Sequence, residues 1–497
     1  MILFHYPFYK YVFTHLDVFS LGGALTFLST FIILYVLAFI SLFLIALISI
    51  RALKILSMVI IITNSIALYF VLTYHVILDR TMMGNVFNTD TGEAASYYSP
   101  KIFFYLFFLG ILPAYAISKI HIQKAKKLHL AMQSFTIVII SVFLLYLNSP
   151  TWLWIDKNAK YVGALAMPWS YTVNAARYQL KEFKQNKKQE LLPDGKLAND
   201  NKMIVVLVIG ESARAANFSL YGYNKETNPY LSKLGIVALQ GATSSATYTT
   251  ASINSILSPT GSTSDEDEPL SSYLQRQGID VIWRSNNWGE PTMKVQTYQK
   301  AEDLRKQCTG EGCDYDEVLL TGLDNEIKNS PKNKTFVVLH NAGSPGPTYY
   351  KKYPQAFEVF KPVCKSVDLQ ICTKQELVNA YDNTILYTDY FLSKVIGTLK
   401  NHDEIPSLLV YVSDHGESLG ESGFYLHGTP YAIAPDFQKN IPFLFWTSPA
   451  FVKENKLENR EYKENYNQKN IFHTVMGAFN MTGKIYDQQL DIFHKTP

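Results

Sequence analysis

The sequence predicts an α-helical transmembrane domain followed by an α/β domain. Uncharged apolar segments dominate up to about residue 150, whereas charged and turn-forming residues are spread evenly after about residue 200. In the second region, short apolar runs alternate with helical patterns, as in an α/β fold. One of these runs ends in Asp414 and His415, and open α/β sheets bind ligands at such strand ends. We therefore divide the chain into a transmembrane domain at 1–155, a connector at 156–201 and a catalytic domain at 202–497.

Four segments of the first domain contain no Asp, Glu, Lys or Arg and are long enough to cross a membrane. A hydrocarbon layer of about 30 Å requires roughly 17–25 helical residues. Soluble helices alternate polar and apolar faces, and these segments do not, so burial in a soluble core is the weaker interpretation. The predicted spans are 21–50, 55–78, 102–118 and 128–150.

The basic loops set the predicted orientation. The turn at 51–54 and the loop at 119–129 carry Arg and Lys, and such loops face the cytoplasm in membrane proteins. The loop at 79–101, the N-terminus and everything after about residue 150 then lie on the opposite side. We therefore expect the catalytic domain outside the cytoplasm.

Apolar runs without alternation predict the strands of a sheet that is covered on both faces. Helical patterns occupy 270–277 and 376–400, and Thr373 with Glu376 forms a capping-box pattern before the second. Together these elements predict one α/β domain of about 300 residues. The predicted strands are 203–209, 281–283, 336–339, 408–412 and 443–446.

The segment 408–428, LLVYVSDHGESLGESGFYLHG, carries the clearest sign of chemistry. Its apolar run ends in Asp414 and His415, His427 follows, and both residue types are ligands of Zn²⁺. Adjacent strand residues point to opposite faces, so both can reach one ion only if the chain turns out of the strand, which Gly416 permits. A polar loop after a core strand is the alternative interpretation.

Two further strand ends and one polar segment could contribute to such a site. The run at 203–209 leads into Glu211, and the run at 336–339 leads into His340, although a histidine in that position is more often structural. The segment 243–258, TSSATYTTASINSILS, is rich in hydroxyl groups. A hydroxyl beside a metal ion would be acidified, as zinc-bound water is, and could act as a nucleophile.

The net charge bears on the binding partners that can be expected, and the cysteine spacings bear on disulfides and metal sites. The formal net charge of +3 gives no reason to expect nucleic-acid binding. The cysteines, Cys308 with Cys313 and Cys364 with Cys372, have the spacings C-x4-C and C-x7-C. In an oxidising compartment two local disulfides are the natural reading, and these pairs close the shortest loops. A zinc site of four thiolates is the alternative, although the spacing is not the usual C-x2-C.

Several motifs, in this order along nearly the whole chain, resemble those of the phosphoethanolamine transferases of Gram-negative inner membranes. That family includes the lipid A modifying enzymes and the mobile colistin-resistance enzymes. The resemblance implies an alkaline phosphatase/sulfatase-like fold for the second domain. The motifs are VVLVIGESARAANFSLYGY, the Thr-rich segment, GPTYYKKYP, ELVNAYDNTILYTDYFLS and SDHGESLGESGFYLHG.

The resemblance implies a zinc centre with a threonine nucleophile. Aligning the Thr-rich segment with the family places the nucleophile at Thr249. A shifted alignment would place it at Thr247 or Thr250 instead. The resemblance also matches the two cysteine pairs with family disulfides. The implied zinc ligands are Glu211, Thr249, Asp414 and His415, for one ion or two.

The resemblance also implies substrate contacts. His427 looks like the histidine that contacts the phosphoryl group. The segment GNVFNTDTGE after the second span resembles the family's lipid-headgroup segment, which suggests Asn85, Thr89 and Glu93 as contacts. Ordinary loop capping is the alternative for those three residues.

The function implied by the resemblance is zinc-dependent transfer of phosphoethanolamine from phosphatidylethanolamine to lipid A or another envelope acceptor. The reaction would pass through a phosphothreonine-type intermediate and lower susceptibility to polymyxin. We expect a multi-pass inner-membrane monomer with a periplasmic catalytic domain. A phosphatase, sulfatase or phosphoglycerol transferase of the same fold is one alternative, although the C/S-x-P-x-R segment of sulfatases is absent around Thr249. A non-catalytic membrane sensor is the other.

The chain departs from the family pattern in four places. Pro345 stands where many members carry a histidine, and His340 lies nearby as a possible substitute for that substrate contact. Serines, Ser245 and Ser255, replace cysteines that often bracket the nucleophile segment, so its rigidity must have another source. The segment 288–291, WGEP, replaces a lysine-bearing segment. Members usually have five spans rather than four, and residues 1–20 resemble the loop before the family's second span, so we expect the four predicted spans to correspond to the family's second to fifth.

Overall fold

The chain forms two units in the computed structural model. One unit comprises Met1–Gly84 with Tyr98–Gln179, and the other comprises Asn85–Tyr97 with Leu180–Pro497. The later boundary lies inside the predicted connector. The structure describes residues 2–89, 94–95, 97–122, 127–147, 150–185, 189–366, 369–458, 460–462 and 465–494.

Three helices among the described residues are long and apolar enough to cross a membrane. They are α2 (Leu21–Ile48), α3 (Ile50–Tyr74) and the continuous helical stretch Pro100–Lys119. The fourth predicted span falls on α8 (Lys127–Leu147), whose described part contains a shorter apolar stretch, Ser134–Leu144.

The second span begins earlier than the sequence predicts because a serine caps it. The hydroxyl of Ser49 accepts a hydrogen bond from the backbone N–H of Ala52, which satisfies a free donor of the first turn. The helix therefore includes Arg51 and Lys54, which the charge criterion excluded. Lys54 Nζ donates to the carbonyl oxygens of Ser118 (2.8 Å) and Ile120 (2.9 Å). This contact joins the two basic segments at one end of the unit.

The third span remains helical through Gly110 and Pro113 because part of it is a π-helix. The stretch runs as α6 (Pro100–Tyr105), the π-helix η2 (Leu106–Ile111) and α7 (Leu112–Lys119). Proline has no N–H to donate and usually breaks a helix interior. Here Leu112 donates to Phe107, five residues back, and Pro113 falls in the first turn of α7, where its missing donor is not needed.

The remaining helices of the first half are shorter or more polar. The segment before residue 20 forms a short 3-10 turn, η1, and the helix α1. Tyr11 of α1 donates to Asn158 of α9 (2.9 Å). Their bounds are η1 (Ile2–His5), α1 (Tyr6–His15), α4 (Arg80–Asn88), α9 (Pro150–Leu165) and α10 (Trp169–Gln185).

A seven-stranded sheet forms the centre of the second unit, with strand order β3-β10-β7-β2-β6-β4-β5. The five strands from β7 to β5 are parallel, and β10 runs antiparallel to both β7 and β3. Each of the five predicted strands is present, with ends that differ by at most two residues. Their bounds are β2 (Met203–Gly210), β3 (Val237–Ala238), β4 (Asp280–Ser285), β5 (Thr297–Lys300), β6 (Lys334–His340), β7 (Ser407–Ser413) and β10 (Phe443–Thr447).

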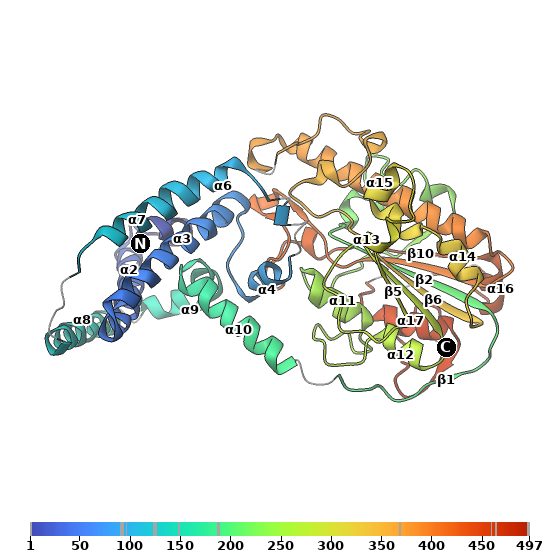
Figure 1. Ribbon diagram of the computed structural model, residues 1–497, viewed down its shortest axis with the longest axis horizontal. Helices are drawn as coiled ribbons and strands as arrows, with labels where there is room; N and C mark the ends of the chain where they lie inside the picture. The colour runs from blue at the N-terminus through green and yellow to red at the C-terminus, as the bar shows by residue number, and fades with distance from the viewer. Residues whose placement is uncertain are drawn as a thin grey trace. The chain divides into compact units, whose positions relative to one another are not determined.

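Helices cover both faces of this sheet, with α12 and α17 on one face and α15 on the other (Figure 1). Every residue of β2, β6 and β7 is buried, as the unbroken apolar runs predict. The capping box at Thr373 and Glu376 is confirmed at the start of α15. The helices are α11 (Thr249–Leu257), α12 (Leu270–Arg276), α13 (Ala301–Leu304), α14 (Leu323–Lys328), α15 (Lys374–Lys400), α16 (Pro449–Asn455) and α17 (Asn470–Ala478).

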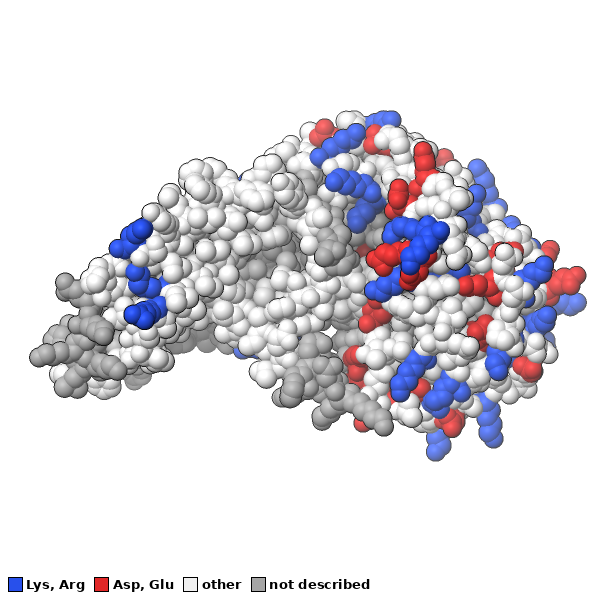
Figure 2. Space-filling model, viewed as in Figure 1, with Lys and Arg blue, Asp and Glu red and all other residues white. Residues whose placement is uncertain are grey.

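Two small sheets complete the unit, β1 (Lys196–Leu197) with β11 (Met481–Thr482), and β8 (Ser418–Leu419) with β9 (Tyr425–Leu426). Figure 2 shows that charged side chains gather on this unit, whereas the visible surface of the helical unit is mostly uncharged.

The register of the sheet brings four strand ends into one row. Gly210 of β2 pairs with Ser413 of β7, Ile209 of β2 pairs with His340 of β6, and His340 pairs with Ser285 of β4. Because these strands are parallel, the residues that follow them emerge at the same edge of the sheet. Ligands bind at this edge in open α/β folds.

Candidate active site

Glu211 leaves the end of β2 through a tight, strained turn. The next residue, Ser212, has φ +57°, a left-handed conformation that is uncommon for a residue with a side chain. The turn is held by Tyr381, whose hydroxyl donates to the carbonyl of Ser212 (2.7 Å) and accepts from the N–H of Arg214 (3.0 Å). The hydroxyl of Ser212 donates to Glu211 Oε1 (2.8 Å). The turn thus fixes the Glu211 carboxylate at the sheet edge, where only 2% of the residue is exposed.

Asp414 and His415 reach the same point from the end of β7. Asp414 Oδ1 accepts from the N–H groups of Ser212 (3.0 Å) and His415 (2.6 Å). His415 Nε2 lies 3.2 Å from Glu211 Oε1 and 3.2 Å from Asp414 Oδ2. The predicted departure from the strand is therefore present. Gly416 permits it by close approach, because a Cβ at this position would lie 2.1 Å from the carbonyl oxygen of Phe437.

Thr249 is the first residue of α11 and contacts this cluster. Its Oγ1 donates to Glu211 Oε2 (3.0 Å) and lies 3.5 Å from His415 Nε2. Thr247, one of the two neighbouring registers, instead donates to the carbonyl of Thr429 (2.6 Å), and the Thr250 methyl lies close to Gly289. Because a helix N-terminus stabilises negative charge, the start of α11 would also stabilise an oxyanion that forms on Thr249.

Asn287, which the sequence analysis did not single out, holds the acceptor of the Thr249 hydroxyl. Its Nδ2 donates to Glu211 Oε2 (3.0 Å) and to the carbonyl of Asn341 (2.9 Å). It follows the end of β4, so the sheet register could have suggested it, but an asparagine in a loop has no distinctive pattern.

The protonation of the cluster is set by burial and by mutual charge. Burial opposes ionisation of Glu211, but the charges of His415 and His427 outweigh it and hold the pKa of Glu211 well below its usual range. Burial, together with the charge of Glu211, raises the pKa of Asp414 well above its usual range. Burial would lower the pKa of His415, yet the Glu211 carboxylate outweighs it and raises that pKa. The pKa values of the two carboxyl groups are therefore shifted in opposite directions.

The donor set fits a divalent metal such as Zn²⁺. Asp414 Oδ2 is buried and has no hydrogen-bond partner among the described residues, although His415 Nε2 lies close by. Two carboxylates and an imidazole are common zinc ligands, and a cation would permit ionisation of both carboxyl groups. Ligand atoms of Glu211, His415 and His427 lie within 4.8 Å of one another.

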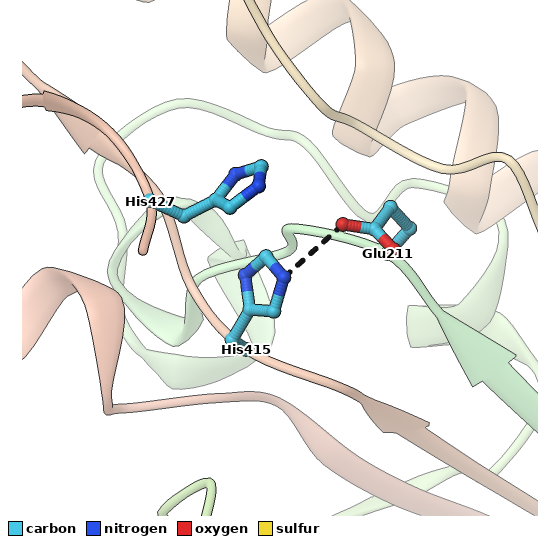
Figure 3. Close-up of side chains that lie close together, drawn as sticks. All are labelled: Glu211, His415 and His427. Atoms are coloured by element: carbon cyan, nitrogen blue, oxygen red, sulfur yellow. Dashed lines mark ion pairs between the residues drawn. The ribbon is translucent and has the colours of Figure 1, made fainter. Parts of the chain in front are cut away.

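His427 follows β9 and completes the cluster (Figure 3). Its ring centroid lies 4.3 Å from that of His415, and its Nδ1 lies 2.8 Å from Glu417 Oε2. Burial and His415 would lower the pKa of His427, but the charge of Glu417 and its hydrogen bond outweigh them, so this pKa is raised.

Glu417 is itself held rigidly, although the sequence analysis gave it no role. It is fully buried, and its Oε1 accepts from the hydroxyl of Tyr349 (2.7 Å) and the N–H of Gly346 (3.1 Å). It lies three residues after Asp414 in the quoted SDHGESL motif, so motif position was the available signal.

The structure does not bring His340 into this cluster. The residue is fully buried, and its Nδ1 contacts Glu290 Oε1 at 2.8 Å. It is not among the residues that line the cleft above Thr249, whereas Pro345 is. The cleft has a volume of about 520 Å³.

The predicted lipid-headgroup segment is only partly described. Asn85 lies against Gly428, since a Cβ on that glycine would be 2.7 Å from Asn85 Nδ2. The hydroxyl of Thr89 donates to the carbonyl of Asn85 (2.6 Å), as in ordinary helix capping. Glu93 lies outside the described residues.

Both predicted disulfides are confirmed, Cys308–Cys313 and Cys364–Cys372. All four cysteines are used in these bonds, so the alternative of a four-thiolate zinc site is wrong.

Comparison with known proteins agrees with this architecture. Residues 36–183 match the family model described as phosphoethanolamine transferase EptA/EptB, and residues 204–481 match the sulfatase model. Phosphoethanolamine transferase EptA of Helicobacter pylori is 40% identical over 99% of this chain and 94% of that protein. Phosphatidylethanolamine transferase Mcr-1 from Escherichia coli is 30% identical over 80% of this chain and 78% of that protein.

One solved structure matches both units of the chain. The integral membrane lipooligosaccharide phosphoethanolamine transferase A (EptA) from Neisseria meningitidis superposes with a TM-score of 0.84 at 31% identity. The match covers 98% of this chain and 95% of that one. The predicted fold, apolar membrane helices followed by a sulfatase-like α/β domain, is confirmed.

Proposed function

This chain belongs to the phosphoethanolamine transferase family and is a transferase, and from that premise we propose its substrates and its chemical route. It takes phosphoethanolamine from phosphatidylethanolamine and passes it to lipid A or another acceptor of the cell envelope. The transfer proceeds through a phosphothreonine-type intermediate on Thr249. The observation that carries the proposal is the hydrogen bond of the Thr249 hydroxyl to Glu211, beside His415.

In the first step, Thr249 Oγ1 gives its proton to Glu211 Oε2, its hydrogen-bond acceptor, and attacks the phosphorus of the donor lipid. The bond from phosphorus to the glycerol oxygen breaks, diacylglycerol leaves into the bilayer, and phosphoethanolamine remains on Thr249. His427, whose raised pKa favours its charged form, donates a proton to the departing oxygen. An acceptor oxygen, such as that of a lipid A phosphate, then displaces Thr249 from phosphorus.

Glu211, Thr249, Asp414 and His415 are the residues that would hold Zn²⁺. The ion would acidify the ligated hydroxyl and neutralise charge that develops on the phosphoryl oxygens.

Several features support an inner-membrane location with the catalytic unit in the periplasm. The basic ends of two spans meet through Lys54, and basic loops favour the cytoplasmic side of a membrane. Two disulfides in the catalytic unit suit an oxidising compartment. Donor and acceptor are both lipids there, so membrane attachment raises their effective concentration.

The proposed intermediate is tested by mass spectrometry of the intact full-length protein after incubation with phosphatidylethanolamine. The wild type should gain the mass of one phosphoethanolamine group, located on Thr249. Thr249→Ala should gain none, while the matched control Thr250→Ala, the next residue of the same helix, should react normally. An adduct on the Thr249→Ala protein, or on another residue of the wild type, would refute the nucleophile.

The acceptor is tested separately in cells. Expression of the protein should add phosphoethanolamine to lipid A and lower susceptibility to polymyxin, because a zwitterionic group replaces negative charge on the phosphate. An unmodified lipid A, with phosphoethanolamine on another envelope component, would reassign the acceptor without changing the first step.

A further inference from the structure

The turn that follows β4 packs directly against the nucleophile. Gly289 has φ +93°, and a Cβ at this position would lie 3.4 Å from Thr249 Cγ2 and 3.2 Å from Thr250 Cγ2. The backbone of this turn therefore forms one wall beside Thr249. A shift of the turn would move both the wall and Asn287, which is attached to it.

Asn287 couples the turn to the oxygen that accepts the nucleophile's hydrogen bond. Glu211 Oε2 receives both the Thr249 hydroxyl and the Asn287 amide, each at 3.0 Å. The position of Asn287 thus sets the direction in which this carboxylate oxygen faces Thr249.

A buried pair behind the turn fixes Asn287 in place. Ser285 Oγ accepts from the N–H of Asn287 (3.1 Å) and makes a short hydrogen bond to Glu290 Oε1. The same Glu290 oxygen contacts His340 Nδ1 at 2.8 Å. The side chain of His340 is fully buried and that of Glu290 is 10% exposed.

The charge on Glu290 depends on this pairing. Burial alone would raise the pKa of Glu290, but the charge and hydrogen bond of His340 outweigh it and lower that pKa. A buried charge without a partner is energetically costly, so Glu290 can stay charged in this buried position only while it contacts His340.

We propose that Glu290 and His340 form a clamp that acts through Ser285 and Asn287 to align Glu211 with the nucleophile. They are positioning residues, because neither lines the cleft. The clamp serves the transfer proposed above and rests on it. It also gives a role to the segment 288–291, in which this chain departs from the lysine-bearing pattern of the family.

The test measures diacylglycerol release from fluorescent phosphatidylethanolamine by the full-length enzyme in detergent. Wild type should be active and Thr249→Ala inactive. An inactive wild type would overturn the proposed function and the clamp together, whereas the variants below bear on the clamp alone.

Glu290→Ala should lower kcat roughly 10–100-fold with KM changed less than about twofold, because reacting groups misplaced by about 1 Å lose rate on that scale. Glu290→Gln keeps an oxygen that accepts from His340 and Ser285, so it should recover activity to within about fivefold of wild type. Wild-type activity in Glu290→Ala, or no recovery in Glu290→Gln, would overturn the clamp.

A double-mutant cycle distinguishes positioning from general loss of structure. If Glu290 acts through Asn287, the double variant Asn287→Ala/Glu290→Ala should be within about twofold of Asn287→Ala alone. If the fold-loss of kcat in the double variant instead equals the product of the two single-variant losses, the proposal is overturned. Should Glu290→Ala fail to fold, Ser285→Ala takes its place in the cycle, with the same expectation.

The chain offers a matched control in a second histidine–carboxylate pair of the same unit. His402 Nε2 lies 3.1 Å from Asp324 Oδ1, and neither residue lines the cleft. Asp324→Ala should leave kcat within about twofold of wild type. A loss equal to that of Glu290→Ala would show that breaking any such pair is sufficient and would overturn the clamp.

Discussion

Replacing Glu417 with Gln tests whether His427 acts as a general acid. Glu417 Oε1 accepts from Tyr349 and Gly346, and glutamine can keep those two bonds through its carbonyl oxygen. The other oxygen, 2.8 Å from His427 Nδ1, becomes an amide nitrogen that donates instead of accepting. Nδ1 must then present its lone pair, so the ring is held in its neutral form. The substitution therefore removes the positive charge that makes His427 an effective acid without removing the ring.

General acid catalysis contributes roughly 10²–10⁴-fold to a rate. We therefore expect Glu417→Gln to lower kcat about 10²-fold with phosphatidylethanolamine, which corresponds to about 2.7 kcal/mol in the barrier. The alkoxide of diacylglycerol is a poor leaving group and needs the proton. With p-nitrophenyl phosphoethanolamine as donor, p-nitrophenolate leaves without protonation, and the variant should keep most of its activity.

The assay compares diacylglycerol release with p-nitrophenolate release by the same preparation. Glu421→Gln is the matched control, because Glu421 lies in the same loop region and pairs with Arg214 (2.7 Å) rather than with His427. Equal losses with the two donors would refute protonation by His427 and leave it a binding role only. Equal activity of the variant and the wild type with both donors would refute the importance of the Glu417 contact.

Three further predictions concern stability and metal. Burial raises the pKa of Asp389 to about 7, so the folded state binds this proton more tightly than the unfolded state, whose carboxyl has a pKa of about 3.9. This contribution to the free energy of unfolding is complete below about pH 4 and is lost as pH rises through about 7, with a total loss of at most about 4 kcal/mol. Between about pH 4 and pH 7, the melting temperature of Asp389→Asn should therefore fall less than that of wild type. A chelator should lower both the melting temperature and diacylglycerol release, and added Zn²⁺ should restore both; unchanged values would argue against a bound metal. Replacing Cys308 and Cys313 with serine opens a short loop and should cost about 2 kcal/mol of unfolding free energy, measured by denaturant titration of the oxidised wild type and the variant.

The sequence was sufficient for the elements that depend on local pattern. Buried strands such as β2 and β7 are unbroken apolar runs, and their polar ends supply Glu211 and Asp414 at the sheet edge. The capping box at Thr373 is equally local. The third span shows where local rules fall short, because the residues alone do not show that a π-helix accommodates Pro113.

The rest of the site depends on contacts between distant residues. Glu417 reaches His427 only because a hairpin of β8 and β9 folds back. Asn287, which follows β4, reaches Glu211, which follows β2, across the intervening strand β6. Neither contact has a spacing that a single sequence can reveal. His340 illustrates the opposite case, a residue at a strand end whose ring is directed to a buried carboxylate rather than to the cleft.

The serines that replace the bracketing cysteines show how the nucleophile segment is kept rigid without a disulfide. Ser255 Oγ donates to Ser245 Oγ at 2.6 Å, so the two positions remain in contact. Such a hydrogen bond contributes only about 1 kcal/mol, less than a disulfide, and needs support. Gln468 provides it, because its Oε1 accepts from the N–H of Ser245 (2.9 Å) and its Nε2 donates to the carbonyl of Asp414 (2.5 Å). The segment that carries Thr249 is therefore tied to the strand end that carries the proposed metal ligands, and a covalent bridge across the segment is not required to hold the two together.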